Sequence, residues 1–95
     1  MAIVEQDITI VNKYGLHARP AMQLVEIANR FGCKIELSTN VLTVDAKSIM
    51  SVMRLAATQG TVVRVVADGH DADKAVVALK QLVDDGFGEM DEPGT

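Results

Sequence analysis

Residues 15–21 have the sequence Gly-Leu-His-Ala-Arg-Pro-Ala, and they join a predicted strand to a predicted helix. Proline is tolerated in the first turn of a helix because the N–H groups there have no partner within the helix. We therefore expect His17 to lie at the N-terminal end of a helix, facing free N–H groups and the positive end of the helix dipole. Anions bind readily at such ends. The stretch predicts a histidine that handles a phosphate.

The apolar residues on either side of this stretch recur with the periods of strands and helices. Alternation predicts four strands, over residues 4–11, 33–39, 41–45 and 61–67. Helical spacing predicts helices over residues 18–31, 49–55 and from a cap at Asp71 or Asp73 to Gly86. The strands alternate apolar and polar residues, so one face of the sheet should be covered and the other wet. The order β-α-β-β-α-β-α predicts an α+β open-faced sandwich, with a mostly antiparallel sheet and helices on one face.

The composition narrows the class of protein further. We expect one domain over residues 1–88 and an acidic tail without regular structure over residues 89–95. A run of about eighteen apolar residues is absent, so we expect no insertion in a membrane. The net charge of −4, from nine Lys and Arg against thirteen Asp and Glu, argues against nucleic acid as a partner. Cys33 is the single cysteine and no secretory signal is evident, so a cytoplasmic location is expected.

Two side chains of the opening stretch are suited to phosphoryl chemistry. A lone histidine in a turn is more often an ordinary surface residue, but His17 stands two residues before Arg19 at a predicted helix start. A neutral imidazole is an available nucleophile near neutral pH. Helix N–H groups can hold a phosphoryl group on the ring while Arg19 steadies its equatorial oxygens. The pair predicts a transient phosphoryl site.

Three separated motifs carry a family resemblance. They are residues 12–21 (Asn-Lys-Tyr-Gly-Leu-His-Ala-Arg-Pro-Ala), residues 47–50 (Lys-Ser-Ile-Met) and residues 59–61 (Gln-Gly-Thr). Over residues 4–88, the sequence resembles the HPr family, the histidine-containing phosphocarriers of the phosphoenolpyruvate-dependent phosphotransferase system. The resemblance implies a four-stranded antiparallel sheet with three helices on one face. It also implies a carrier rather than an independent enzyme, without cofactor or metal.

The resemblance assigns a role to each residue of the site. His17 would accept phosphate at Nδ1 from phosphorylated enzyme I and donate it to an enzyme IIA domain, with Arg19 assisting the transfer. Ser48 matches a position that an HPr kinase/phosphorylase modifies in some bacteria. From the residues alone, Ser48 is a helix N-cap, a role that holds with or without phosphorylation. A phosphate there would add about two negative charges beside the apolar residues of the short helix that follows, and would weaken docking to acidic partners.

The short helix over residues 49–55 carries more apolar residues than one buried face needs. We expect Val52 and Leu55 to be buried, and Met50 and Met53 to be at least partly exposed. Methionine adapts to several partners. The resemblance places a docking surface here, and the predicted partner contacts are Ala18, Pro20, Ile49, Met50, Met53 and Arg54.

Two other functions stay open at this point. Residues 12–13, 21–22 and 85–89 are similar to the nitrogen-related phosphocarrier, whose relay regulates rather than imports sugar, whereas residues 47–50 are closer to the sugar-branch protein. A binding module that docks on transcription regulators through phosphorylated Ser48 is a further alternative, ranked low because family members of that kind lack the histidine. The small size favours a monomer.

Val41 is a poor residue for a tight turn because β-branching disfavours positive φ, so the hairpin there should be wider than two residues.

Overall fold

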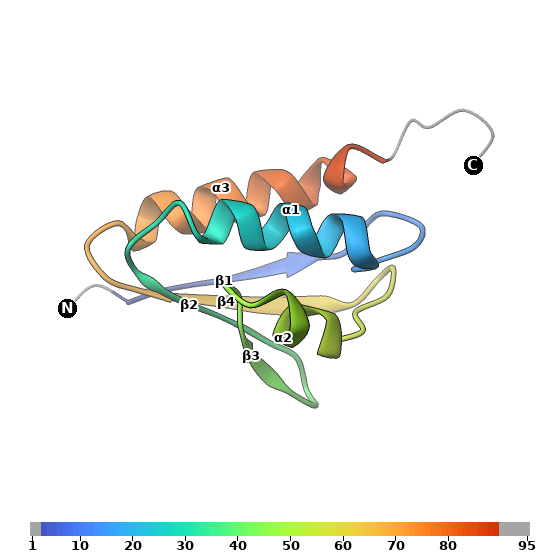
Figure 1. The fold of residues 1–95 in the computed structure, drawn as a ribbon, viewed down its shortest axis with the longest axis horizontal. Helices are drawn as coiled ribbons and strands as arrows, with labels where there is room; N and C mark the ends of the chain where they lie inside the picture. Colours follow the sequence, from blue (N-terminus) through green and yellow to red (C-terminus); the bar gives the residue numbers. More distant parts are fainter. Residues whose placement is uncertain (1–2, 90–95) are drawn as a thin grey trace.

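The chain forms a four-stranded antiparallel sheet with helices on one face in a computed structural model that describes residues 3–89 (Figure 1). The strands are β1 (Ile3–Thr9), β2 (Lys34–Ser38), β3 (Thr43–Asp45) and β4 (Val62–Asp68). The helices are α1 (Ala18–Ala28), α2 (Ile49–Arg54) and α3 (Ala72–Asp84), followed by a 3₁₀ turn, η1 (Gly86–Gly88). The predicted α+β open-faced sandwich is confirmed.

The strand order is β1-β4-β2-β3, so the last strand of the chain lies between the first and the second. Every neighbouring pair is antiparallel. Pairing of β1 with β4 places the end of one strand beside the start of the other, where Ile10 and Gly60 are linked by an N–H···O bond of 2.7 Å. The loop that leaves β1 towards His17 therefore lies beside the loop that follows α2.

The core fills the space between the sheet and the helices. Alternate residues of each long strand point into it, and Ile35, Leu37, Val63 and Val65 are at most 1% exposed. Figure 1 shows α1 and α3 side by side over the sheet, while α2 packs on α1 and β3. Both long helices face the core with the apolar stripe that their spacing predicted. Leu24, for example, lies on the buried stripe of α1. The core is mainly aliphatic, and Phe87 adds a buried aromatic ring to it.

The other face of the sheet is open and carries charged side chains. The Arg64 guanidinium donates from Nε to Asp7 Oδ1 at 2.9 Å, and its Nη1 lies 3.7 Å from Glu5. All three side chains are more than half exposed, so their ion pairs contribute little to stability. This confirms the wet face that the alternation predicted.

The hairpin between β2 and β3 has a loop of residues 39–42, because Ser38 pairs with Thr43. The N–H of Thr39 donates to the carbonyl of Leu42 at 2.9 Å and closes the loop. Val41 stands at its tip, 91% exposed. The expectation of a loop wider than two residues is confirmed, although β3 begins at Thr43 rather than at residue 41.

The predicted cap of α3 is wrong in its mechanism. Asp71 occupies the N-cap position, but its side chain makes no capping hydrogen bond to α3. Instead its carboxylate accepts the backbone N–H groups of Gly32 at 2.8 Å and Cys33 at 3.0 Å. The carboxylate thus ties the start of α3 to the turn before β2. Two charge-assisted bonds at this turn outcompete one bond at the helix end.

The predicted tail, residues 89–95, lies outside the described residues except for Glu89. That residue follows η1, whose Phe87 is only 3% exposed, so the described part of the chain is held against the core up to this point. Within residues 3–89, the helices are too short or too polar to cross a bilayer.

Candidate functional site

His17 is the N-cap residue of α1, as the sequence predicted. Its backbone is extended, with φ −72° and ψ −176°, and its carbonyl accepts the first helical hydrogen bond, from Ala21 at 3.0 Å. The imidazole makes no capping bond, and 40% of the side chain is exposed. The first turn of α1 contains no acidic residue. The ring therefore stands at a positive helix end without a carboxylate from that helix beside it.

The loop before His17 is held by buried hydrogen bonds. Asn12 is fully buried, and its Nδ2 donates to the carbonyl of Gly15 at 2.8 Å. The N–H of Leu16 donates to the carbonyl of Ala57 at 2.9 Å. Ala57 comes three residues after the end of α2, so this bond fixes that end of α2 against the loop that carries His17.

A carboxylate from the end of the described chain binds the imidazole. The Nε2 atom of His17 lies 2.9 Å from Glu89 Oε2 and 3.2 Å from Oε1. Asn12 Nδ2 donates to the same carboxylate, at 2.9 Å from Oε1. The Glu89 side chain is only 10% exposed. Asn12 thus holds both the loop before His17 and the carboxylate that contacts its ring.

The environment of Glu89 favours its charged form. Burial raises the pKa of this carboxyl, but the hydrogen bonds from Asn12 and His17 and the positive charge of Arg19 act in the other direction and outweigh it. The net effect is a pKa below the ordinary value. The carboxylate beside His17 is therefore ionised at neutral pH.

Sequence reasoning missed Asn12 and Glu89 as site residues. The sequence places Asn12 only in the motif at residues 12–21, and Glu89 only at the start of the predicted tail. The available signal was Phe87, an apolar residue between two glycines just after a helix, which indicates that the chain returns to the core there.

The remaining residues of the opening stretch have different exposures. Ala18 and Arg19 are exposed beside His17, where a partner can reach them. Pro20 is buried, so its assignment as a docking contact is corrected. Its ring fills the first turn of α1, where the missing N–H has no helical partner to lose. Tyr14 is 62% exposed, and its ring meets that of His17 edge to face at 6.1 Å between centroids.

The short helix α2 presents an apolar surface. Met50 is 78% exposed, Met53 41% and Ile49 40%, whereas Val52 is fully buried. The predicted split of this helix is confirmed, with Leu55 partly buried. Among the other expected contacts on α2, Arg54 is exposed.

Ser48 occupies the N-cap position of α2. Its Oγ accepts a hydrogen bond from the N–H of Ser51 at 3.3 Å, so the predicted cap is confirmed. The residue is half-buried, and the neighbouring Lys47 donates from Nζ to the carbonyl of Phe31 at 2.7 Å. The start of α2 is thereby joined to the turn after α1.

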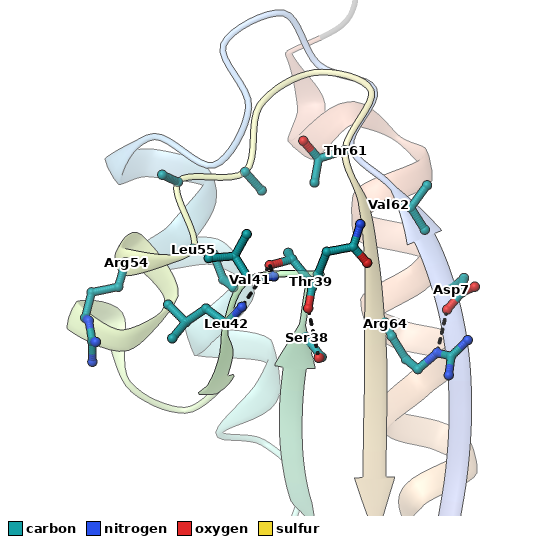
Figure 2. A pocket seen from close by; sticks show the side chains of 13 residues that line it. Asp7, Ser38, Thr39, Val41, Leu42, Arg54, Leu55, Thr61, Val62 and Arg64 are labelled. Carbon is teal, nitrogen blue, oxygen red and sulfur yellow. Dashed lines mark hydrogen bonds and ion pairs between the residues drawn. The ribbon is translucent and has the colours of Figure 1, made fainter.

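A hollow of about 910 Å³ lies away from His17, between the β2–β3 hairpin loop, the end of α2 and the start of β4 (Figure 2). Figure 2 shows Arg64 and Asp7 turned towards each other on its strand side. The guanidinium of Arg64 already binds Asp7, which neutralises its charge. Arg64 therefore attracts an anion into the hollow only weakly. Within residues 3–89, no group of three or more His, Cys, Asp or Glu side chains is arranged to hold a metal ion.

Comparison with known proteins places this geometry in a family. The family defined as the PTS HPr component phosphorylation site matches residues 4–85. The Phosphocarrier protein HPr of Xylella fastidiosa (strain Temecula1) is 47% identical over 87 residues, which cover 92% of this chain and 98% of that protein.

Solved structures agree with this match. A crystal structure of HPr from Thermoanaerobacter tengcongensis superposes with a TM-score of 0.87 at 44% identity, covering 90% of this chain and 97% of that one. The catabolite repression protein Crh of Bacillus subtilis superposes with a TM-score of 0.71 at 40% identity, covering 86% and 94%. That protein was crystallised as a dimer with a swapped domain.

Proposed function

The chain belongs to the HPr family of phosphocarriers of the phosphotransferase system, and we propose that it accepts a phosphoryl group on His17 from phosphorylated enzyme I and passes it to an enzyme IIA domain. The observation that carries this proposal is the place of His17, half-exposed at the N-terminal end of α1. The N-terminal end of a helix, with its N–H donors and its positive dipole end, stabilises an anion on the ring.

Arg19 is proposed as the electrostatic partner of the transfer. It lies in the first turn of α1 and is exposed, so its guanidinium can reach a phosphoryl group shared between two proteins. The transferring group spreads charge over three equatorial oxygens, and guanidinium donors suit these oxygens. The apolar surface of α2, Ile49, Met50 and Met53, is proposed as the docking contact, with Ala18 and Arg54 at its rim.

Incubation with phosphoenolpyruvate and a bacterial enzyme I tests the proposal. The wild type should acquire acid-labile phosphate, and His17→Ala should acquire none. His70→Ala is the matched control, because His70 is exposed and lies at the turn before α3. Acid-labile phosphate on the His17→Ala variant overturns the site.

The class of acceptor is proposed from the motif at residues 47–50, which favours the sugar branch. The nitrogen-related relay is the second candidate, favoured by residues 85–89. Transfer from the phosphorylated protein to sugar-type and to nitrogen-type acceptors decides between them. Faster transfer to the nitrogen-type acceptor rejects the sugar branch.

Phosphorylation of Ser48 is proposed as a regulatory mark. The hydroxyl already accepts an N–H at the start of α2, so a phosphate there meets favourable donors and the fold should survive the modification. An HPr kinase/phosphorylase with ATP should place acid-stable phosphate on the wild type and none on Ser48→Ala. The same phosphoserine is the feature that a transcription regulator would recognise.

We propose a monomer, although Crh shows that the fold admits a swapped dimer. Light scattering of the purified chain tests this directly. A measured mass of twice 10.2 kDa would show a dimer and overturn the proposed monomer.

A further inference from the structure

We propose that Glu89 is a positioning residue for His17: its carboxylate binds the protonated Nε2 and so leaves the lone pair on Nδ1, the nitrogen that accepts the phosphoryl group. This inference rests on the proposed function and adds to it a residue from the far end of the chain. Glu89 acts through His17 and does not itself touch the phosphoryl group.

The geometry selects one tautomer of the ring. An ionised carboxylate has no hydrogen to donate, so its contacts of 2.9 and 3.2 Å with Nε2 require the proton to be on Nε2. A neutral imidazole carries one N–H, and its other nitrogen is then an acceptor. Nδ1 of His17 therefore holds the free lone pair.

The carboxylate is itself held in place. Asn12, fully buried, donates its amide N–H to Oε1 of Glu89 at 2.9 Å, and the same amide nitrogen binds the carbonyl of Gly15. Phe87, buried two residues before Glu89, anchors the backbone independently of the carboxylate. Glu89 is thus fixed from both sides, and an orienting group needs this rigidity.

Phosphoryl transfer to Nδ1 leaves the proton on Nε2. The Nδ1 lone pair forms the new bond to phosphorus, while the bond between phosphorus and the donor atom of enzyme I breaks and its electron pair returns to that donor. Nε2 keeps its proton, so the His17 ring becomes positive. The carboxylate of Glu89 faces that charge from the opposite side of the ring. When an acceptor attacks the phosphorus, the pair of the Nδ1–P bond returns to His17.

A carboxylate that orients an imidazole and faces the cation formed on it is a recurrent arrangement in enzymes, where it stabilises the ring without taking its proton. Here the two residues are separated by 72 positions in the chain. They meet because the 3₁₀ turn η1 directs the chain back to His17 just before Glu89. The contact explains why a largely buried carboxylate is placed beside a nucleophile rather than in solvent.

Glu89→Gln tests the inference, with Asp85→Asn as the control. Both changes remove one negative charge from the end of the chain, but Asp85 is exposed and four residues away. The Gln amide can turn its N–H towards Nε2, which moves the ring proton to Nδ1. Nitrogen-15 NMR of the neutral His17 ring should show the Nε2–H form in the wild type and in Asp85→Asn, and a shift towards Nδ1–H in Glu89→Gln.

The rate should follow the tautomer. Phosphorylation by phosphoenolpyruvate and enzyme I should lose about 10-fold or more in kcat/KM in Glu89→Gln, the size of effect known for carboxylates and carbonyls that orient a metal-binding imidazole through its other nitrogen. Asp85→Asn should retain the wild-type rate. Backbone amide spectra should stay alike in all three proteins, since Phe87 still anchors the segment.

Two results overturn the inference: a Glu89→Gln variant whose His17 keeps the Nε2–H form, or one phosphorylated at the wild-type rate. The failure of the proposed function is a separate result. If the wild type acquires no phosphate at all, phosphoryl transfer is rejected, while the NMR comparison still decides whether Glu89 sets the tautomer.

Discussion

The backbone of Gly15 lies directly against the carbonyl of Ala57, closer than a side chain at residue 15 would permit. A Cβ built on Gly15 would lie within 3.0 Å of the Ala57 oxygen and 2.9 Å from the Cα of Thr58. The φ of Gly15 is +64°, a left-handed conformation that L-residues adopt only under strain. This close approach lets Leu16 bond to Ala57 and thereby places His17 beside the end of α2.

Gly15→Ala should therefore destabilise the protein and impair the site together. The left-handed backbone alone costs about 1–2 kcal/mol, and the contact with Ala57 adds to this because a backbone carbonyl cannot rotate away. Urea unfolding measures the stability, and phosphorylation by enzyme I measures the site. The free energy of unfolding should therefore fall by about 3 kcal/mol. Up to about 2 kcal/mol of this comes from the left-handed backbone, and about 1 kcal/mol more, the value of one buried hydrogen bond, comes from the contact with Ala57.

Gly60→Ala is the matched control for that substitution. Its φ is +90°, but no atom lies within 4 Å of a Cβ built there, so only the conformational cost remains. If both variants lose the same stability, the contact between Gly15 and Ala57 carries no weight.

Asp71 should make stability depend on pH in the acid range. Hydrogen bonds from the backbone N–H of Gly32 and from Cys33 hold the pKa of this carboxyl below its ordinary value of 3.8, against the opposing effect of burial. A depressed folded pKa means that the stabilisation is present above the unfolded pKa and is lost as pH falls through the folded one. Asp71→Asn should thus be less stable than the wild type at pH 6 and approach it below pH 3.

Asp73→Asn is the control for this prediction, since Asp73 is exposed in the first turn of the same helix. Thermal unfolding from pH 2.5 to 7 gives the comparison. Parallel curves for Asp71→Asn and the wild type across that range contradict the assignment.

The sequence predicted features that depend on neighbouring residues. Period-two and helical spacing identified all four strands and three helices, because burial on one face imposes those periods. The N-terminal location of His17 followed from Pro20 in the first turn, and the exposure of Met50 followed from counting the apolar residues on one short helix. Each inference needed only about ten consecutive residues.

The sequence did not predict contacts between residues far apart in the chain. Asp71 binds a turn 38 residues earlier, and Glu89 binds Asn12 and His17 across 77 and 72 residues. Such contacts depend on where β4 and α3 lie in the fold, which no local pattern encodes. An acidic residue after a helix is also typical of a solvated end, so the only local signal near Glu89 was the apolar Phe87 two residues before it.

Met50 and Val52 should separate docking from folding, although both are apolar residues of α2. Met50→Ala should change stability by no more than about 0.5 kcal/mol, because the side chain is 78% exposed. It should raise the KM of enzyme I transfer roughly fivefold, the loss of about 1 kcal/mol of docking.

Val52→Ala is the complementary variant. Its side chain is fully buried, so the loss should be about 1–3 kcal/mol of stability with little change in KM while the protein is folded. Urea unfolding and steady-state kinetics on both variants make the comparison. A KM that is unchanged in Met50→Ala contradicts the docking role of α2.

Ser48 should combine two roles that substitutions can separate. Its Oγ caps α2 by accepting the N–H of Ser51, so Ser48→Ala should lose about 1 kcal/mol of stability and keep its KM for enzyme I. Ser48→Asp keeps an acceptor at the N-cap, so its stability should stay near that of the wild type. It adds a negative charge beside Ile49 and Met50, so its KM should rise.

Ser51→Ala is the control, because it removes a hydroxyl from the same helix but leaves the capping N–H in place. Urea unfolding and transfer kinetics give both quantities for the three variants. The cap is contradicted by a Ser48→Ala variant as stable as Ser51→Ala. The charge effect is contradicted by a Ser48→Asp variant with the wild-type KM, since a phosphate at that position acts on docking through the same added charge.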